Sequence, residues 1–286
     1  MKYVALESNE SCLQAVLYVC EEKLVRVQFF RGVAFLLFAV MSAVAYGIAP
    51  VVYRPALACT SQYRAMGIFS LFSIALGLLL PWSSVDLFGV VSAVLAALLG
   101  GVVGSWLYIT AVKIGGASVG NISSSLYIVL LPLFAWRLHM APAAALVLLG
   151  LAVASWDDQG SRRGALYGVS AAFVWAISIN FYAAAVNALG PGGAMFIRGV
   201  VVFLTSLYLG RGGPVCKVLR LVAGGFIDTF VGFGSYTLAV SLGDYVSATL
   251  VMSTYPLVTA VAERPFRRRK ALGALLAVAG LALATG

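Results

Sequence analysis

Apolar residues fill this chain in long runs, and charged residues gather in the short segments between them. The runs are about 15 to 25 residues long, the length that a helix needs to cross about 30 Å of hydrocarbon. Gly, Ala, Leu and Val fill them continuously, whereas the strands of an outer-membrane barrel alternate apolar and polar positions. The pattern therefore predicts an all-α integral membrane protein with ten transmembrane helices in two inverted five-helix repeats.

The predicted helices follow a tail of mixed charge at residues 1–31. They cover residues 33–52, 65–80, 88–112, 118–136, 142–156, 165–187, 194–209, 219–242, 246–262 and 271–285. Residues 32–157 form the first predicted repeat and residues 158–286 the second. The linkers are short and rich in Gly, Pro and charged residues, which interrupt helices, so we expect no soluble domain.

The division into repeats depends on an internal similarity. When residues 231–255 are laid over residues 103–127, eight of 25 positions are identical, at a period of 128 residues. Five spans are an odd number, so a second copy enters the membrane from the opposite side. Inverted repeats are typical of secondary transporters, whose sites lie near the middle of the membrane between the repeats.

Composition leads to the same class. The chain is 62% hydrophobic and 10% charged, with a mean hydropathy of +1.00, too few charges to cover a soluble protein of this size. The net charge of +9 falls in the linkers, where it orients a membrane protein. No basic groove interleaved with aromatic residues is evident, so nucleic acid is not an expected partner.

Asp228 is the acid that lies inside a predicted span, the eighth. An ionised carboxylate at that depth is costly unless it is paired, hydrated or protonated. It is therefore a candidate for proton coupling or for binding a substrate ammonium; the alternative is a carboxylate close enough to the interface to reach water or Arg220. Its helical face repeats a face of the third span, with Gly224, Asp228, Gly232 and Tyr236 matching Ala96, Gly100, Gly104 and Tyr108.

Other polar and aromatic side chains share helical faces that can line a cavity. The candidates are Tyr46, Tyr108, Asn121, Ser125, Trp175, Ser178, Tyr182, Tyr236, Thr249 and Ser253. Aromatic walls suit amphipathic or cationic compounds, because rings stack and attract cations. The alternatives are that Ser and Thr bond carbonyls of their own helix, that Asn joins helices, and that the aromatic residues face lipid.

Nothing in the sequence indicates catalysis or a cofactor. His139, the only histidine, lies in a linker without a second ligand and is expected to be an exposed loop residue. Cys12, Cys20, Cys59 and Cys216 have no close pairing or metal-ligand spacing, so we expect free small apolar side chains. The sequence predicts no enzyme, no metal site and no cofactor.

The C-terminal residues carry a family resemblance. Tyr255-Pro256-Leu257-Val258, Ala262-Glu263-Arg264 and the run Gly273 to Gly280, together with the five-plus-five duplication, resemble the EamA-type transporters of the drug/metabolite transporter superfamily. The resemblance covers residues 32–286. The first half departs from it, because Arg137 to Met140 stand where a Glu is expected and Pro132 is one turn late. The resemblance implies a polyspecific or metabolite transporter with a central cavity.

Together these features predict a secondary active transporter, an exporter of small organic metabolites or amphipathic compounds, in the cell membrane. Its partners would be a small-molecule substrate and the lipid bilayer. The alternative is a nucleotide-sugar or sugar-phosphate carrier, which would need several cations facing the cavity, whereas the cations here are expected at span ends. A membrane-embedded enzyme or a channel is less well supported, since converging catalytic groups and filter motifs are absent.

The basic residues also predict an orientation. Of the 19 Lys and Arg residues, thirteen fall in the odd-numbered linkers and six, including Arg198, in the tail and the even-numbered linkers. The positive-inside rule therefore places both termini outside, although many of the resembling transporters keep both inside.

Overall fold

The computed structural model describes residues 4–155 and 161–262, together with 272–273, 275–276, 279–280 and 283. Within these residues the secondary structure is helical, without strands, which confirms the all-α class. The elements are α1 (Val4–Leu57), α2 (Gln62–Leu79), α3 (Leu87–Ala96), η1 (Ala97–Gly104), α4 (Ser105–Gly115), α5 (Ala117–Ser124), α6 (Tyr127–Phe134), η2 (Leu138–Met140), α7 (Ala141–Ser155), α8 (Arg162–Leu209), α9 (Val218–Gly225), η3 (Phe226–Phe233), α10 (Gly234–Leu242), α11 (Tyr245–Met252) and α12 (Tyr255–Ala262).

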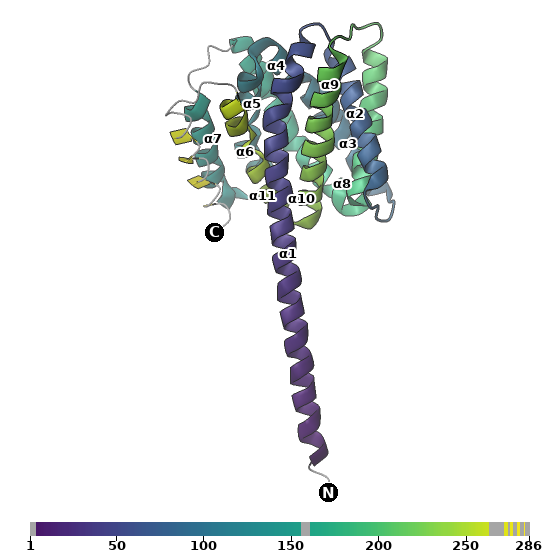
Figure 1. Cartoon of the computed structure of the whole chain (residues 1–286), viewed down its shortest axis with the longest axis vertical. Coiled ribbons are helices and arrows are strands. Elements are labelled where there is room, and N and C mark those ends of the chain that lie inside the picture. The colour runs from purple at the N-terminus through teal and green to yellow at the C-terminus, as the bar shows by residue number, and fades with distance from the viewer. Residues whose placement is uncertain are drawn as a thin grey trace.

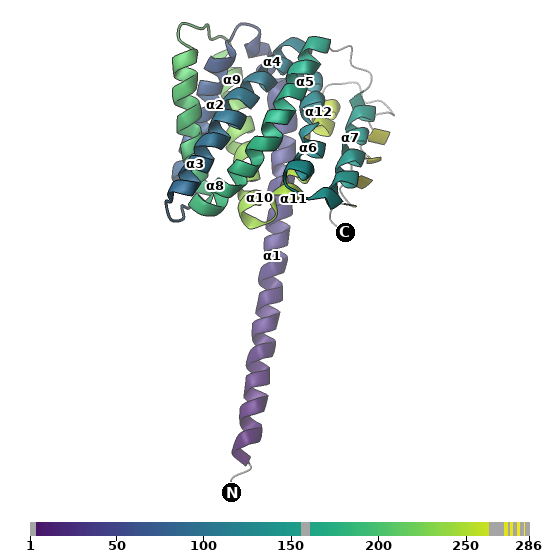
Figure 2. The ribbon, with the colours of Figure 1, turned by 180° about the vertical axis from the view of Figure 1, so that it is seen from behind.

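The helices stand side by side in one bundle, and α1 continues beyond one end of it towards the N-terminus (Figures 1 and 2). Residues 4–31, predicted as part of a tail, continue α1 without a break in the helix. Polar side chains cap the N-termini of several of the other helices. The side chains of Ser61 and Asp244, for example, accept hydrogen bonds from the backbone N–H groups of Arg64 and Ser247 at 3.3 and 2.9 Å, which satisfies donors that a helix start leaves free.

Helix α8 is a hairpin of two helices rather than one rod. Gly190 has φ 76° and ψ 168°, a conformation that glycine adopts without steric cost, and Pro191 begins the second arm, as proline often does. A Cβ on Gly190 would meet Ser83, whereas Cβ atoms on Gly164 and Gly210 would meet Gly115 and Tyr63. Both ends of α8 therefore lie at the end of the bundle opposite to Gly190, and the hairpin crosses it twice.

Six stretches of the described residues are long and apolar enough to cross a membrane, judged by length and composition. They are Phe30–Leu57, Gln62–Leu79, Leu87–Gly115, Ala117–Phe134, Arg162–Leu209 and Val218–Leu242. The stretch Arg162–Leu209 holds both arms of the α8 hairpin, and the apolar stretch Leu138–Gly150, which covers η2 and most of α7, is shorter. The chain is thus a multi-pass membrane protein; the last predicted span, residues 271–285, lies mostly outside the described residues.

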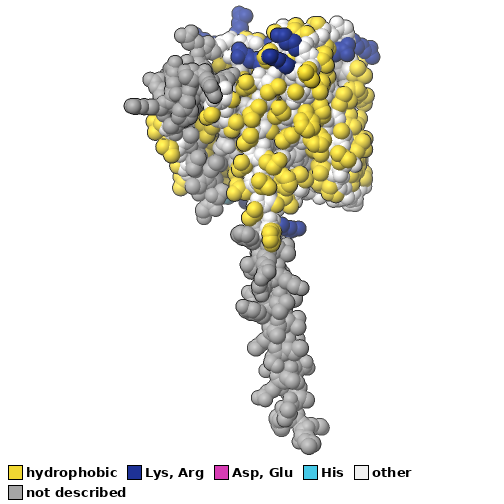
Figure 3. Space-filling model, in the orientation of Figure 1, with side chains coloured by type: hydrophobic (Ala, Val, Ile, Leu, Met, Phe, Trp, Pro, Cys, Tyr) yellow, Lys and Arg dark blue, Asp and Glu magenta, His cyan; other side chains and the backbone are white. Residues whose placement is uncertain are grey.

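The outer surface is apolar along the flank and basic at one end (Figure 3). Large apolar side chains such as Leu79, Leu166 and Leu204 are more than half exposed on it, as lipid-facing residues are. We call one end of the bundle the basic end, because Arg54, Arg64, Lys113, Arg162, Arg163, Arg211, Lys217 and Arg220 lie at or near it. At the opposite end Arg137 forms an exposed ion pair with Asp244 at 3.7 Å.

A disulfide corrects the expectation of free cysteines. Cys59, after α1, is bonded to Cys216, before α9, with their Cα atoms 5.9 Å apart. Thr60 supports the junction, because its hydroxyl accepts a hydrogen bond from the backbone N–H of Cys216 at 3.2 Å. The two cysteines are 157 residues apart, so local spacing gave no sign of the pair. The bond ties the α1–α2 loop to the α8–α9 loop at the basic end.

Candidate functional site

The bundle contains a partly open cavity of about 140 Å³ whose walls come from both halves of the chain. Helices α1, α2 and α4 contribute Tyr46, Met66 and Tyr108 from the first half. Helix α8 and the segments η3 and α10 contribute from the second half. For scale, a cavity of about 150 Å³ in a soluble protein accommodates benzene. In this conformation the space suits a ligand about the size of one ring, or a few waters.

Seven of the residues predicted for a site line this cavity. They are Tyr46, Tyr108, Trp175, Ser178, Tyr182, Asp228 and Tyr236. The prediction that Tyr108 and Tyr236 occupy equivalent places also has a structural counterpart, since each lies buried in the helix that follows a widened segment, η1 or η3.

The segments η1 and η3 are π-helices, in which backbone hydrogen bonds join residues five apart. Gly100 lies in η1 and Asp228 in η3, 128 residues later, which is the period of the internal repeat. Short π-helical turns occur frequently at functional sites. No sequence pattern used above distinguishes a π-helical turn from an α-helical one, so this feature was not predicted.

Asp228 is half-buried, and its exposed part faces the cavity. The hydroxyl of Thr229 donates a hydrogen bond to the Asp228 carboxylate at 3.4 Å. The alternative expectation, a carboxylate reaching Arg220 near the interface, is not met, because the described side chains form no ion pair with Asp228. Asp228 is therefore an acid placed on the inner wall of the bundle.

Gly100 in the first half has a different environment. Its carbonyl accepts hydrogen bonds from the indole N–H of Trp175 and the hydroxyl of Ser105, both at 3.1 Å. A Cβ on Gly100 would lie 2.3 Å from the hydroxyl oxygen of Ser178. The small residue thus lets α8 approach η1 closely, as expected for glycine at a helix contact in a membrane.

Arg198 is the cavity residue that the sequence analysis placed wrongly. It was counted with a linker, at the start of the seventh span, but it lies inside the second arm of α8 and lines the cavity. Its guanidinium carbon is 4.0 Å from the centre of the Phe233 ring. The error came from treating residues 190–193 as a loop; Pro191 instead begins the helix, which puts Arg198 two turns deep.

Aromatic rings form much of the remaining wall. Tyr108 and Trp175 have ring centres 5.2 Å apart, and Tyr182 lies 4.9 Å from Phe233 and 6.4 Å from Tyr236. These separations are typical of stabilising aromatic pairs. Tyr53 also lines the cavity, and its fully buried hydroxyl has no hydrogen-bond partner among the described residues. Sequence analysis missed Tyr53 because the first predicted span ended at residue 52, whereas α1 continues to Leu57.

Asn121 and Thr249, predicted to line the cavity, instead hold cavity tyrosines. The Tyr108 hydroxyl donates to the Asn121 side-chain oxygen, and the Tyr236 hydroxyl bonds the Thr249 hydroxyl at 2.9 Å. Both pairs are separated by 13 residues, so the same arrangement occurs in each half. The polar faces of the fourth and ninth predicted spans are thus turned to the tyrosines rather than to the open space.

Ser125 and Ser253 also lie outside the cavity lining. Each hydroxyl bonds a carbonyl of its own helix, Ser125 to Asn121 and Ser253 to Leu250, both at 2.6 Å. This was the alternative given for such residues. Both serines mark the turn that interrupts their span, between α5 and α6 and between α11 and α12.

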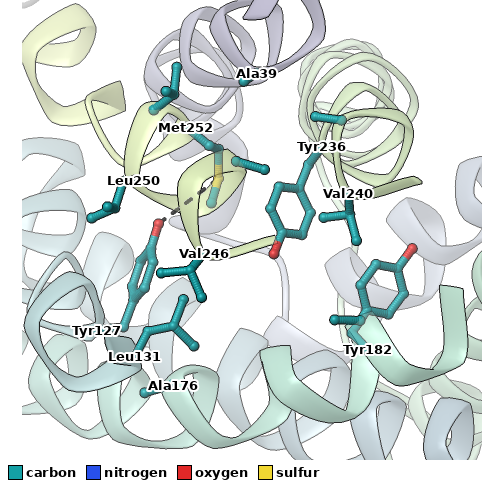
Figure 4. Close-up of a cluster of buried hydrophobic side chains, with 14 of the residues drawn as sticks. Ala39, Tyr127, Leu131, Ala176, Tyr182, Tyr236, Val240, Val246, Leu250 and Met252 are labelled. Atoms are coloured by element: carbon teal, nitrogen blue, oxygen red, sulfur yellow. Dashed lines mark hydrogen bonds between the residues drawn. The ribbon is translucent and has the colours of Figure 1, made fainter. Parts of the chain in front are cut away.

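These two turns contact each other through tyrosines. The Tyr127 hydroxyl points at the sulfur of Met252, 3.9 Å away (Figure 4). The Tyr255 hydroxyl lies 3.0 Å from that of Ser124. Residues 127 and 255, like 124 and 252, are 128 positions apart. Each half therefore makes the same contact with the other across the centre of the bundle.

Comparison with known proteins agrees with this picture. Residues 162–286 match the sequence model of the EamA-like transporter family. This part of the chain is therefore similar to the EamA-like transporter family. The match indicates a membrane transporter of the drug/metabolite transporter superfamily, as the resemblance predicted, and a transporter family rather than an enzyme family.

Two further comparisons concern the whole chain. No curated protein matches it. Among solved structures 27 chains match, including one crystal structure with a TM-score of 0.69, 15% sequence identity and coverage of 88% of this chain and 96% of that chain. At that identity the likeness concerns the fold alone, which extends over both halves.

Proposed function

We propose that this protein is a secondary active transporter of small organic metabolites or amphipathic compounds in the plasma membrane, working as an exporter by alternating access. The observation that carries the proposal is the cavity inside the bundle, which both halves line and which has a carboxylate in its wall. A binding site between two repeats near the middle of the membrane is the arrangement of many secondary transporters.

The proposal includes ten spans in two inverted repeats. Its support is the direction of equivalent segments. The segment α3–η1–α4 ends beside Gly116, where a Cβ would meet Arg54 at the basic end. The segment α9–η3–α10 begins at the basic end, after Cys216, and ends at Gly243, where a Cβ would meet Phe35 at the opposite end. Equivalent segments thus run in opposite directions, as inversion requires.

The cavity wall indicates the kind of compound carried. Its aromatic rings suit a ligand with an apolar or aromatic body, and its volume of about 140 Å³ limits the size held in this conformation. A nucleotide-sugar carrier has less support, because Arg198 is the single cation among the described lining residues and phosphate recognition usually employs several.

Asp228 is the proposed coupling residue. A carboxylate that faces a small cavity in a low-dielectric interior can bind either a proton or a cationic group of the substrate, and the two compete for it. Proton binding would then change which conformation is favoured, and coupling requires such a difference between states. Arg198 and the Thr229 hydroxyl are the charged and polar neighbours that act on Asp228.

Reconstituted vesicles test the proposal. Purified protein in liposomes is assayed for accumulation of a metabolite panel with and without a pH gradient, and for exchange of labelled against unlabelled compound. We expect Asp228→Asn, which keeps size but removes titration, to abolish gradient-driven accumulation while exchange continues. Asp86→Asn is the matched control, because Asp86 is an exposed cap of α3 and Asn also caps helices.

The two parts of the proposal fail differently. If no compound moves faster than in protein-free vesicles, the transporter proposal is wrong. If wild type and Asp228→Asn accumulate a compound with the same pH dependence, the protein transports but Asp228 is not its coupling residue.

A further inference from the structure

Arg198 is a cation within the bundle that has no ion-pair partner among the described residues. Among the described residues its guanidinium has no hydrogen bond and no ion pair; it lies over the ring of Phe233, 4.0 Å from the ring centre, and faces the cavity. A guanidinium carries five N–H donors, and a charged group inside a membrane protein normally pairs with another or faces a site. Its donors are therefore available to a ligand.

Asp228, the acid in the same cavity, does not bind the Arg198 guanidinium. Asp228 lines the same cavity, and the charge of Arg198 acts on it, yet the two side chains form no ion pair among the described contacts. The Arg198 charge also acts on the hydroxyls of Tyr46 and Tyr182. Arg198 thus acts electrostatically on several groups of the cavity wall, Asp228 among them, without forming an ion pair.

The surroundings hold the guanidinium in place before a ligand arrives. Phe233 supports one face of it, and η1 approaches so closely that a Cβ on Gly101 would come within 3.7 Å of its central carbon. A planar guanidinium stacked on a ring presents its donors as a fork that matches a carboxylate. Prior ordering of the side chain lowers the entropy that binding costs.

We propose that Arg198 binds an anionic group of the transported compound, and that the preferred ligands are small carboxylates joined to an aromatic or apolar body. The inference rests on the proposed transport function and names the substrate class of the same cavity. One cation and a volume of about 140 Å³ fit a monoanion with a single ring. The rings of Tyr108, Trp175 and Tyr182 contact the body, while Arg198 selects the carboxylate over a neutral group.

Binding to the full chain in detergent or nanodiscs tests this without requiring transport. Trp175 lines the cavity, so tryptophan fluorescence reports occupancy. The probes share a phenyl ring and a three-carbon chain: 3-phenylpropanoate, 3-phenylpropanamide and 3-phenylpropylamine. We expect wild type to bind the anion at least about tenfold more tightly than the amide, the usual scale for hydrogen bonds to a charged group.

Variants assign the preference to Arg198. We expect Arg198→Gln to remove the tenfold difference and Arg198→Lys to retain part of it. Arg211→Gln should leave it unchanged; Arg211 also lies over a ring, that of Tyr208 at 4.8 Å, but at the exposed basic end. Asp228→Asn should also keep the anion preference, since Arg198 rather than Asp228 contacts the carboxylate.

Several results would overturn the inference. They are equal or tighter binding of the amide or the amine by wild type, no binding of the anion, an unchanged preference in Arg198→Gln, and loss of the preference in Asp228→Asn, which would make Asp228 the partner of Arg198. The order in which wild type binds the three probes tests the inference even if Arg198→Gln does not fold. Arg198-dependent binding without transport would contradict only the proposed function, and transport without such binding would contradict only this inference.

Discussion

The π-helical segments η1 and η3 occupy equivalent places in the two halves but differ in chemistry. In η1, Gly100 also lines the cavity, but Ser178 packs against it and its carbonyl accepts a hydrogen bond from Trp175. In η3, Asp228 is open to the cavity. The duplicated feature is the widened backbone, whereas the charge belongs to one half. We infer that η1 serves the packing of α8, whereas η3 supplies the carboxylate that a proton-coupled transporter needs.

The largest expected effect comes from filling the space at Gly100. In Gly100→Ala the added Cβ would lie 2.3 Å from the Ser178 hydroxyl oxygen and 3.0 Å from the Ser178 Cβ; rotation of the hydroxyl relieves the first contact, whereas the second requires α8 to shift. Overpacking of this kind typically costs about 1–3 kcal/mol, and Gly100→Asp should cost more because it also buries a charge. Thermal unfolding in detergent, followed by fluorescence, measures the loss.

A second substitution separates this clash from a general loss of packing. Ser178→Gly removes the atoms that the new Cβ meets, at 2.3 and 3.0 Å. We expect the double variant Gly100→Ala, Ser178→Gly to unfold at a higher temperature than Gly100→Ala alone. If Gly100→Ala unfolds at the wild-type temperature, then η1 does not form the close contact with α8 described here.

The reverse change, Asp228→Gly, should affect function while sparing the fold. Asp228 borders open space, so its removal relieves no clash; the hydrogen bond that it loses is the long one, 3.4 Å, from the Thr229 hydroxyl, which also lines the cavity. The cost should be about 1 kcal/mol or less, the usual value for glycine in a helix, while gradient-driven accumulation is lost. Thermal unfolding and vesicle accumulation, measured on the same preparation, give both values; a variant that accumulates substrate normally would show that η3 needs no carboxylate.

The pattern of apolar runs was sufficient to predict an all-α membrane protein, because helices that cross a bilayer need long, continuous stretches of apolar residues. The period of 128 residues also paired Tyr108 with Tyr236, and both line the cavity. Arg198 was missed because its depth depends on where the second arm of α8 begins, a boundary that Gly190 and Pro191 left open. Asn121 and Thr249 were misplaced since a polar helical face does not say whether it meets a cavity or a tyrosine hydroxyl. The π-helices and the Cys59–Cys216 bond depend on tertiary packing and have no local signature.

Opposite direction of the two halves can be tested by sided labelling. Gly212 is exposed at the basic end and His139 is exposed at the opposite end. With the native cysteines replaced, the positive-inside rule predicts that His139→Cys reacts with an impermeant thiol reagent on intact cells. Gly212→Cys should react several-fold less until the cells are opened.

The position of the native disulfide gives a second, opposing expectation for the orientation. Disulfides persist mainly in oxidising compartments, and Cys59–Cys216 lies at the basic end, so it favours the orientation opposite to the one that the charges predict. Preferential labelling of Gly212→Cys from outside would agree with the disulfide and overturn the charge argument. If Gly212→Cys and His139→Cys were labelled from the same side, the inverted arrangement itself would be contradicted.

The smallest expected effects come from the paired tyrosines, which compare the two halves one hydrogen bond at a time. In Tyr108→Phe the buried side-chain oxygen of Asn121 loses its donor, which should cost about 1–2 kcal/mol of unfolding free energy. In Tyr236→Phe the Thr249 hydroxyl still donates to the Tyr245 carbonyl at 2.7 Å, so no donor is left unpaired and about 0.5–1 kcal/mol is expected. The unfolding free energies of both variants in detergent give the comparison.

The replacements Asn121→Thr and Thr249→Asn exchange the hydrogen-bond partners between the halves. If the partner determines the cost of losing the tyrosine hydroxyl, the order of the two tyrosine effects should reverse in the exchanged protein. An unchanged order would show that the surrounding helices determine the cost instead.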